Sequence, residues 1–218
     1  MRLNGVLMNN VVLLGDSVFD NAAYVGGGPD VVAQLRERLP AGWRATLGAV
    51  DGSVAADVAR QLRLLPRDAT HLVVSTGGND ALGQAALLEE GARSMGEALG
   101  RLSAVAGRFE ADYLGMLRGL RGTNLPAAVC TIYYPRFPEP LLQRLAVTAL
   151  AHFNDAITRA AFERGLPLLD LRLICSEDAD YANPIEPSSR GGQKIARAVA
   201  RLVAEHDFGA GRTEVFTA

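Results

Sequence analysis

The sequence predicts an α/β protein, a three-layer α/β/α sandwich built on a five-stranded parallel sheet. Three observations support this prediction. Short apolar runs rich in β-branched residues alternate along the chain with segments in which apolar residues recur at helical spacing. The apolar runs lack the polar alternation of a half-exposed strand, so each is expected to be covered on both faces. Parallel neighbours need crossover connections, and the intervening helical segments supply them.

The expected elements follow one another without a linker, an internal repeat or a low-complexity tract, so residues 1–218 are predicted to form a single domain. Proline marks several element ends, because Pro29 suits the first turn of a helix and Pro66 stops one. The strands are expected at residues 11–14, 43–50, 71–75, 126–134 and 166–171. Helical segments are expected at residues 29–39, 54–65, 85–121, 141–164 and 188–205, with residues 85–121 forming either one helix or two.

The helical segment at residues 85–121 carries a stripe of apolar residues at helical spacing. Such a stripe is typical of a helix face that packs against a core, and we expect no cofactor there. The residues expected to be buried are Met95, Leu99, Leu102, Val105, Phe109, Leu117 and Leu120.

Composition argues against several classes of function. The formal net charge is −2 with acidic and basic residues intermixed, which does not indicate a nucleic-acid or anionic-membrane surface. No apolar run is long enough to cross a bilayer, and Asn9 and Asn10 interrupt any signal-peptide core, so a cytoplasmic location is predicted. Cys130 and Cys175 lack metal-ligand spacing, so we expect reduced thiols and neither a metal nor a cofactor.

Polar residues follow three of the expected strands, at the point where each strand ends. They are Asp16 and Ser17 after the first strand, Asp51-Gly52-Ser53 after the second, and Gly77-Gly78-Asn79-Asp80 after the third. In a doubly wound parallel sheet the carboxyl ends of the strands share one edge, where such folds bind ligands. Alone, Asp16 and Ser17 are more simply caps of the next helix, and each of the three motifs is more often a turn than a site. Together, and in this order, the three motifs predict a site.

These residue types suit acyl transfer. A serine hydroxyl attacks a carbonyl carbon, and neighbouring N–H donors stabilise the oxyanion that forms. Ser17 is the candidate nucleophile, with the Asn79 side-chain amide beside it.

With these motifs the chain resembles the SGNH/GDSL hydrolase family of esterases and lipases, over nearly its whole length. Gly15-Asp16-Ser17 matches the first block of the family and implies Ser17 as the nucleophile. Asp51-Gly52-Ser53 is similar to the second block and implies the Gly52 N–H as an oxyanion donor, and the third block implies the Asn79 amide as another. The resemblance also implies the flavodoxin-like SGNH hydrolase fold.

The last block of the family departs from the pattern in this chain. The resemblance implies a catalytic Asp and His just before the terminal helix, but Asn183 and Glu186 stand at these positions. We therefore take Glu186 as the candidate base, and Asn183 as the second candidate catalytic residue of this block. The three histidines, His71, His152 and His206, are expected to have packing or surface roles.

Three functions are compatible with these residues. The first is hydrolysis of a small acylated ester by Ser17 with Glu186 as base. The second is an inactive SGNH-type protein that binds an acyl or acetylated ligand, and the third is an acyltransferase. The sequence does not indicate the acyl chain length or the oligomeric state.

Overall fold

The computed structural model describes residues 2–3 and 6–217, and its main feature is a parallel sheet of six strands. All neighbouring strands of this sheet are parallel, and their spatial order is β4-β3-β5-β6-β7-β8. A separate antiparallel pair, β1 and β2, precedes it. The strands are β1 Arg2–Leu3, β2 Val6–Leu7, β3 Asn9–Gly15, β4 Trp43–Leu47, β5 His71–Ser75, β6 Ala127–Cys130, β7 Leu168–Leu169 and β8 Val215–Phe216.

The predicted parallel α/β architecture is confirmed, but the sheet has one strand more than the five expected. The additional edge strand is β8, which pairs with β7 through Leu168 and Leu169. Strand β8 has only two residues, and Val215 is half exposed. The sequence therefore has no buried apolar run that would predict a strand here. A strand this short depends on its neighbour, which local sequence does not reveal.

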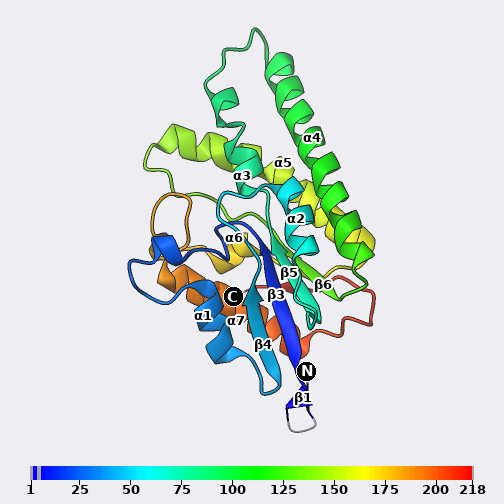
Figure 1. Cartoon of the computed structure of the whole chain (residues 1–218). Coiled ribbons are helices and arrows are strands. Elements are labelled where there is room, and N and C mark those ends of the chain that lie inside the picture. The colour runs from blue at the N-terminus through cyan, green and yellow to red at the C-terminus, as the bar shows by residue number, and fades with distance from the viewer. Residues whose placement is uncertain (1, 4–5, 218) are drawn as a thin grey trace.

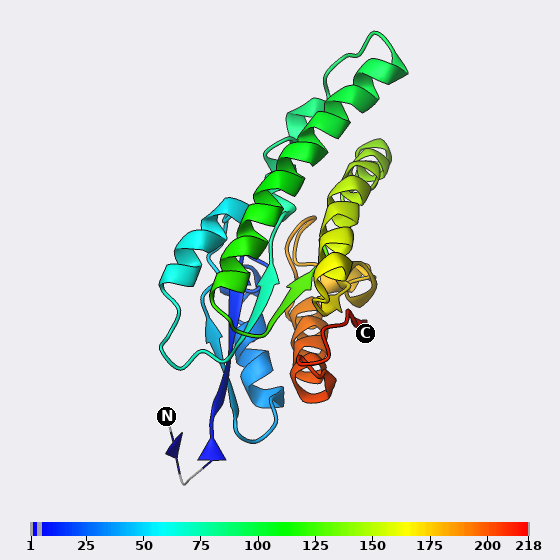
Figure 2. The ribbon, with the colours of Figure 1, turned by 90° about the vertical axis from the view of Figure 1, so that its right-hand side faces the viewer.

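Helices cover both faces of the sheet (Figures 1 and 2). One face carries α1 and α7, which pack against each other, and the opposite face carries α2, α4 and α5. The α-helices are α1 Val31–Arg38, α2 Val58–Arg63, α3 Gly78–Leu82, α4 Met95–Gly122, α5 Pro140–Arg164, α6 Leu171–Ile174 and α7 Ser189–Glu205. Four short 3-10 turns complete the described chain: η1 Ala22–Tyr24, η2 Ala55–Asp57, η3 Ala85–Leu88 and η4 Asp178–Asp180.

The central strand β3 separates two apolar cores. Its side chains alternate between faces with the period of a strand, so Val11 and Leu13 join one core while Val12 and Leu14 join the other. All four are almost fully buried, and each stabilises the fold by about 1.5–3 kcal/mol relative to an exposed position. Burial on both faces explains why this segment is apolar without alternation.

The prediction for the stripe on α4 is wrong at its first turns. Met95 and Leu99 are 74% and 55% exposed, whereas Val105, Phe109 and Leu117 are buried. Helix α4 is 28 residues long, and its first part projects beyond the sheet in both views (Figures 1 and 2). Helical spacing gives the direction of a side chain around the helix, but not how far the neighbouring layer extends.

Candidate active site

The segment that carries Ser17 begins where β3 ends. Gly15 has φ of 117°, and a Cβ atom at this position would lie 1.6 Å from the carbonyl oxygen of Ser75 on β5. Only glycine accepts both the left-handed backbone and this close approach. The turn places Asp16 and Ser17 at the carboxyl edge of the sheet, where both are buried.

The Asp16 carboxyl group is buried beside the candidate nucleophile. Burial raises its pKa to about 8, although the Val18 N–H donates to Oδ1 at 3.2 Å and opposes the rise. The negative charges of Glu186 and Asp80 raise it further. At neutral pH the protonated form therefore predominates, and Asp16 adds little negative charge next to Ser17.

Asn79 lies in the turn that follows β5. Gly77 has φ of 114° and allows helix α3 to begin at Gly78, directly after the strand. The Asn79 side-chain amide donates one hydrogen bond to the Ser53 carbonyl oxygen, at 3.0 Å. A carboxamide nitrogen has two N–H donors, so the second is available to the cavity that Asn79 lines.

The second strand-end segment supports Asn79 but lies beside the cavity. Gly52 is exposed and is not among the described residues that line the cavities of this region. Its neighbour Ser53 holds the Asn79 amide, and the Ala55 N–H donates to Asp80 at 3.0 Å. These bonds tie the second and third strand ends together. The role of the Gly52 N–H as an oxyanion donor stays a prediction.

The segment that carries Glu186 lies just before α7. The Asn183 side-chain oxygen accepts hydrogen bonds from the N–H groups of Ile185 and Glu186, both at 3.0 Å. Such a turn holds the backbone of Glu186 in place. Ser188 then caps α7 by accepting from the Gly191 N–H at 3.2 Å. Asn183 thus shapes the main chain that presents Glu186.

Two groups that follow β6 fasten the same segment from the other side. The Tyr133 hydroxyl donates to the Ile185 carbonyl oxygen at 2.6 Å, and the Arg136 N–H donates to the Pro184 carbonyl oxygen at 2.7 Å. The sequence predicts only a strand over residues 126–134. The role of Tyr133 depends on a contact 52 residues away, and no local signal marks it.

Glu186 is buried, with 7% of the residue exposed, and its Oε2 has no hydrogen-bond partner among the described residues. Burial raises the pKa of its carboxyl group. A hydrogen bond with the Ser17 hydroxyl lowers this pKa, and the negative charge of Asp51 raises it by a smaller amount. No ion pair with Glu186 is formed within the described part of the chain. The carboxylate therefore keeps free acceptor capacity.

The histidines lie elsewhere in the described chain, and none of them lines a cavity of this site. His71 packs between Trp43 and Phe208, with ring centroids at 4.6 and 5.0 Å. His206 is buried and lies 2.8 Å from a Glu214 oxygen. His152 is exposed on α5.

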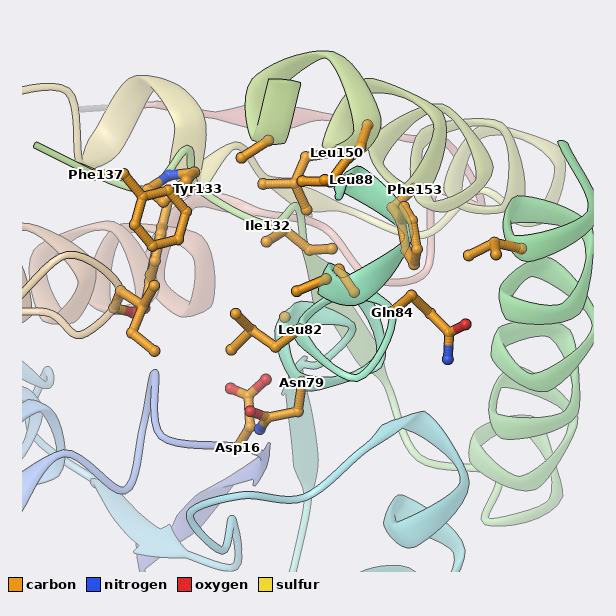
Figure 3. A pocket seen from close by; sticks show the side chains of 18 of the residues that line it. Asp16, Asn79, Leu82, Gln84, Leu88, Ile132, Tyr133, Phe137, Leu150 and Phe153 are labelled. Carbon is orange, nitrogen blue, oxygen red and sulfur yellow. The ribbon is translucent and has the colours of Figure 1, made fainter. Parts of the chain in front are cut away.

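Ser17, Asn79 and Glu186 line one cavity of about 510 Å³, which we call the main cavity. Figure 3 shows Asp16 and Asn79 on one side of it, with Ile132, Leu150 and Phe153 across from them. Apart from the residues near Ser17, its wall is mostly hydrocarbon. It is lined by Asp16, Ser17, Val18, Ser75, Thr76, Gly78, Asn79, Ala81, Leu82, Gln84, Ala85, Ala86, Leu87, Leu88, Glu89, Leu102, Val105, Ile132, Tyr133, Pro135, Phe137, Leu142, Ala146, Ala149, Leu150, Phe153, Ile185 and Glu186.

A second hollow of about 350 Å³, the side groove, is more open and adjoins the main cavity. Glu186 belongs to the walls of both hollows, and so do Leu82 and Phe137. Asn183 lines only the side groove. The structure therefore brings Ser17, Asn79 and Glu186 together, places Asn183 at the adjacent groove and leaves Gly52 outside. The side groove is lined by Tyr24, Leu82, Phe137, Asn183, Pro184, Ile185 and Glu186.

Two further features are absent from the residues that the structure describes. No group of three or more His, Cys, Asp or Glu side chains there is arranged to hold a metal ion. Among the same residues, no helix is both long and apolar enough to cross a membrane.

Solved structures with the same fold include several ester hydrolases. An extracellular lipase from Streptomyces rimosus matches with a TM-score of 0.64 and 17% identity, over 88% of this chain and 97% of that chain. A phospholipase A1 from Streptomyces albidoflavus matches with a TM-score of 0.61 and 17% identity, over 91% of this chain and 100% of that chain. An acetyl xylan esterase matches with a TM-score of 0.65 and 17% identity, over 90% of this chain and 100% of that chain. Comparison with curated proteins finds no match.

Sequence comparison with family models gives a more direct assignment. The model of the GDSL-like lipase/acylhydrolase family matches residues 13–205, which span Ser17, Asn79 and Glu186. This range includes the three strand-end segments and the whole of α7. The chain therefore belongs to the GDSL-like lipase/acylhydrolase family, a family of enzymes that hydrolyse acyl esters.

Proposed function

We propose that the protein is a serine esterase in which Ser17 attacks the carbonyl carbon of a small acylated substrate and Glu186 is the base. The observation that carries this proposal is the shared cavity: Ser17, Asn79 and Glu186 line it together, and Glu186 Oε2 is buried with free acceptor capacity. Family membership supports ester hydrolysis in general. The residue assignment is our own.

In the first half of the reaction, the Ser17 oxygen bonds to the carbonyl carbon while its proton passes to Glu186. The carbonyl oxygen becomes an oxyanion, which accepts hydrogen bonds from the Asn79 amide and from the N–H group of Ser17. When the tetrahedral species collapses, the alcohol leaves with the proton from Glu186. Water then attacks the acylated Ser17, again with Glu186 as base, and releases the acid.

A carboxylate is an unusual base for a serine, because its ordinary pKa is far below that of the hydroxyl. Burial of Glu186 raises its pKa and so improves the match. A neighbouring cation would reverse this effect, and the described residues that line the main cavity include no Lys, Arg or His. Protonated Asp16 has a related role, since it spares the oxyanion a second nearby negative charge.

The test is an esterase assay on p-nitrophenyl esters with the wild type, Ser17→Ala and Ser103→Ala. Ser103 is exposed on α4, so it serves as a matched serine control. We expect turnover in the wild type and in Ser103→Ala, and none in Ser17→Ala. A wild type without turnover at acid and neutral pH would favour an acyl-binding protein. Release of acyl products only when an added alcohol or amine accepts the acyl group would favour an acyltransferase.

The cytoplasmic location and the absence of a cofactor stay predictions from the sequence.

A further inference from the structure

The Glu186 carboxylate depends on its own main chain for orientation. In a nucleophile–base pair, the base is usually held in turn by a third group, which fixes its side chain against the nucleophile. Glu186 meets the Ser17 hydroxyl, but its Oε2 has no hydrogen-bond partner among the described residues. The groups that hold the backbone around Glu186 therefore take the place of that third group.

Two side chains from outside the loop reach the main chain on either side of Glu186. The Tyr133 hydroxyl donates to the Ile185 carbonyl oxygen at 2.6 Å. The Asn21 side-chain amide donates to the Pro187 carbonyl oxygen at 3.3 Å. The bond from Tyr133 is the shorter of the two, and it ends on the residue directly before Glu186. It ties the loop to the segment that follows β6.

Tyr133 is itself firmly placed. The preceding residue, Ile132, donates its N–H to the buried Asn154 side chain of α5 at 2.8 Å and accepts from the same side chain at 2.9 Å. The Tyr133 ring is buried and packs edge-on against the Tyr181 ring, with centroids 5.3 Å apart. Burial raises the pKa of Tyr133, so its hydroxyl keeps the proton that it donates. The hydroxyl is therefore a fixed anchor for the loop.

The buried position of Glu186 depends on the same loop. Burial is the largest cause of the raised pKa of Glu186, so a loop that moves toward solvent would bring this pKa down. Such a movement would also draw the carboxylate away from Ser17. The groups of the described chain that interact electrostatically with Glu186 carry no positive charge, and they are Asp16, Asp51, Tyr24 and Tyr133.

We propose that Tyr133 is a positioning residue for the base, and that its hydroxyl, acting through Ile185, holds the Glu186 carboxylate against Ser17. This inference rests on the proposed function, because it takes Glu186 as the base. Tyr133 also lines the main cavity, so its ring and its hydroxyl have separate tasks. A change limited to the hydroxyl tests the positioning without removing the ring from the cavity wall.

The key variant is Tyr133→Phe. Because a displacement of about 1 Å can cost on the order of 100-fold in rate, kcat should fall by about 10- to 100-fold while KM changes little. The midpoint of the pH profile of kcat/KM should move to lower pH, since a better solvated Glu186 loses its proton more readily. A role in stability alone would lower the melting temperature but leave kcat and this midpoint unchanged, and that result would overturn the proposal.

A double-mutant cycle with Glu186→Gln tests whether Tyr133 acts through the base. In the Glu186→Gln background there is no base left to position. Tyr133→Phe should then lower kcat by less than about threefold, so the two changes are not additive. A larger loss in that background would contradict the proposal.

The matched control is Tyr113→Phe, which removes a hydroxyl from another buried tyrosine. Tyr113 is on α4 and is not among the described residues that line the main cavity. Its kcat and its pH midpoint should equal those of the wild type.

Tyr181→Phe is the second variant, in case Tyr133→Phe does not fold. The Tyr181 hydroxyl donates to the Tyr134 carbonyl oxygen at 2.8 Å, and its main chain bridges to Pro187, directly after Glu186. Loss of this hydroxyl loosens the same loop, so kcat and the pH midpoint should both fall. Wild-type values in whichever of the two variants folds would overturn the proposal.

Carbon-13 NMR titration of the Glu186 carboxyl group separates this proposal from the esterase assignment, with Glu186→Gln identifying the signal. If the wild type hydrolyses no ester but Tyr133→Phe lowers the pKa of Glu186, the positioning stands and the esterase assignment fails. If the wild type hydrolyses esters and Tyr133→Phe matches it in kcat and in this pKa, only the positioning fails. If there is neither hydrolysis nor a change in this pKa, both fail.

Discussion

The segment that presents Ser17 and the segment that presents Glu186 face the same cavity, but different forces hold them. The first continues from β3, whose last residue Gly15 is paired with Ser75 of the neighbouring strand. The second is a loop before α7 whose only strand-like pairing with the described residues is the isolated bridge between Tyr181 and Pro187. Side-chain hydrogen bonds, such as those to the Asn183 oxygen, provide the rest.

This contrast predicts how strictly each segment fixes the residue that it presents. At Gly15 the backbone conformation and the contact with Ser75 exclude any other residue, so the motif is tied to the geometry. In the loop before α7, the turn requires an acceptor at position 183, which either Asn or Asp supplies. Glu186 lines the cavity, and its Oε2 has no hydrogen-bond partner among the described residues, so no structural bond at that oxygen fixes the residue type.

The largest effect is expected from the loop segment, at Glu186. Glu186→Gln keeps the shape but cannot accept the Ser17 proton, so kcat/KM should fall by about 10²–10⁴-fold. In the wild type, activity should rise with pH as Glu186 loses its proton, with a midpoint above the ordinary pKa of a glutamate because burial favours the protonated form. The measurement is a pH profile of kcat/KM.

Glu163→Gln is the matched control for this change, because Glu163 is exposed on α5. Its pH profile should equal that of the wild type. Wild-type rates in Glu186→Gln would show that the carboxylate is not the base.

The next effect concerns Asn79, which belongs to the strand-end segments. If its free N–H stabilises the oxyanion, Asn79→Ala should lower kcat by about 10²–10³-fold while KM changes little. The same amide also holds Ser53, so the melting temperature should be measured alongside the kinetics. A rise in KM at unchanged kcat would instead place the amide against the ground-state substrate.

The smallest effect is on stability, at Asp16. Its pKa is about 8 in the folded protein and near 3.8 in the unfolded chain, so the folded state binds the proton more tightly. Stability is therefore greatest below the unfolded value and declines as pH rises through about 8. Asp16→Asn keeps the acceptor for the Val18 N–H and removes the ionisation.

We therefore expect Asp16→Asn to raise the melting temperature at pH 8–9, by about 2–4 °C for each kcal/mol recovered, and to have little effect near pH 4. The measurement is the melting temperature of the wild type and of Asp16→Asn between pH 4 and pH 9. An equal difference at every pH would mean that packing, and not titration, causes the change.

Several features of the site were open to prediction because they depend on residues close together in the chain. Apolar runs that end in polar residues predicted the carboxyl edge of the sheet. Ser188 was a recognisable start for the last helix, and it caps α7. The edge strand β8 and the exposure of Met95 escaped prediction, because each depends on how far a distant neighbour extends.

The sequence by itself determined the parallel α/β architecture and the meeting of Ser17 and Asn79 at one sheet edge, since both follow from local backbone preference and strand polarity. Only the tertiary structure decided the electrostatics and the shape of the site. The pKa of Asp16 depends on burial by segments far away in the chain, and the main cavity forms where α4 and α5 extend beyond the sheet. Desolvation and cavity shape arise from many non-local contacts, which no short motif records.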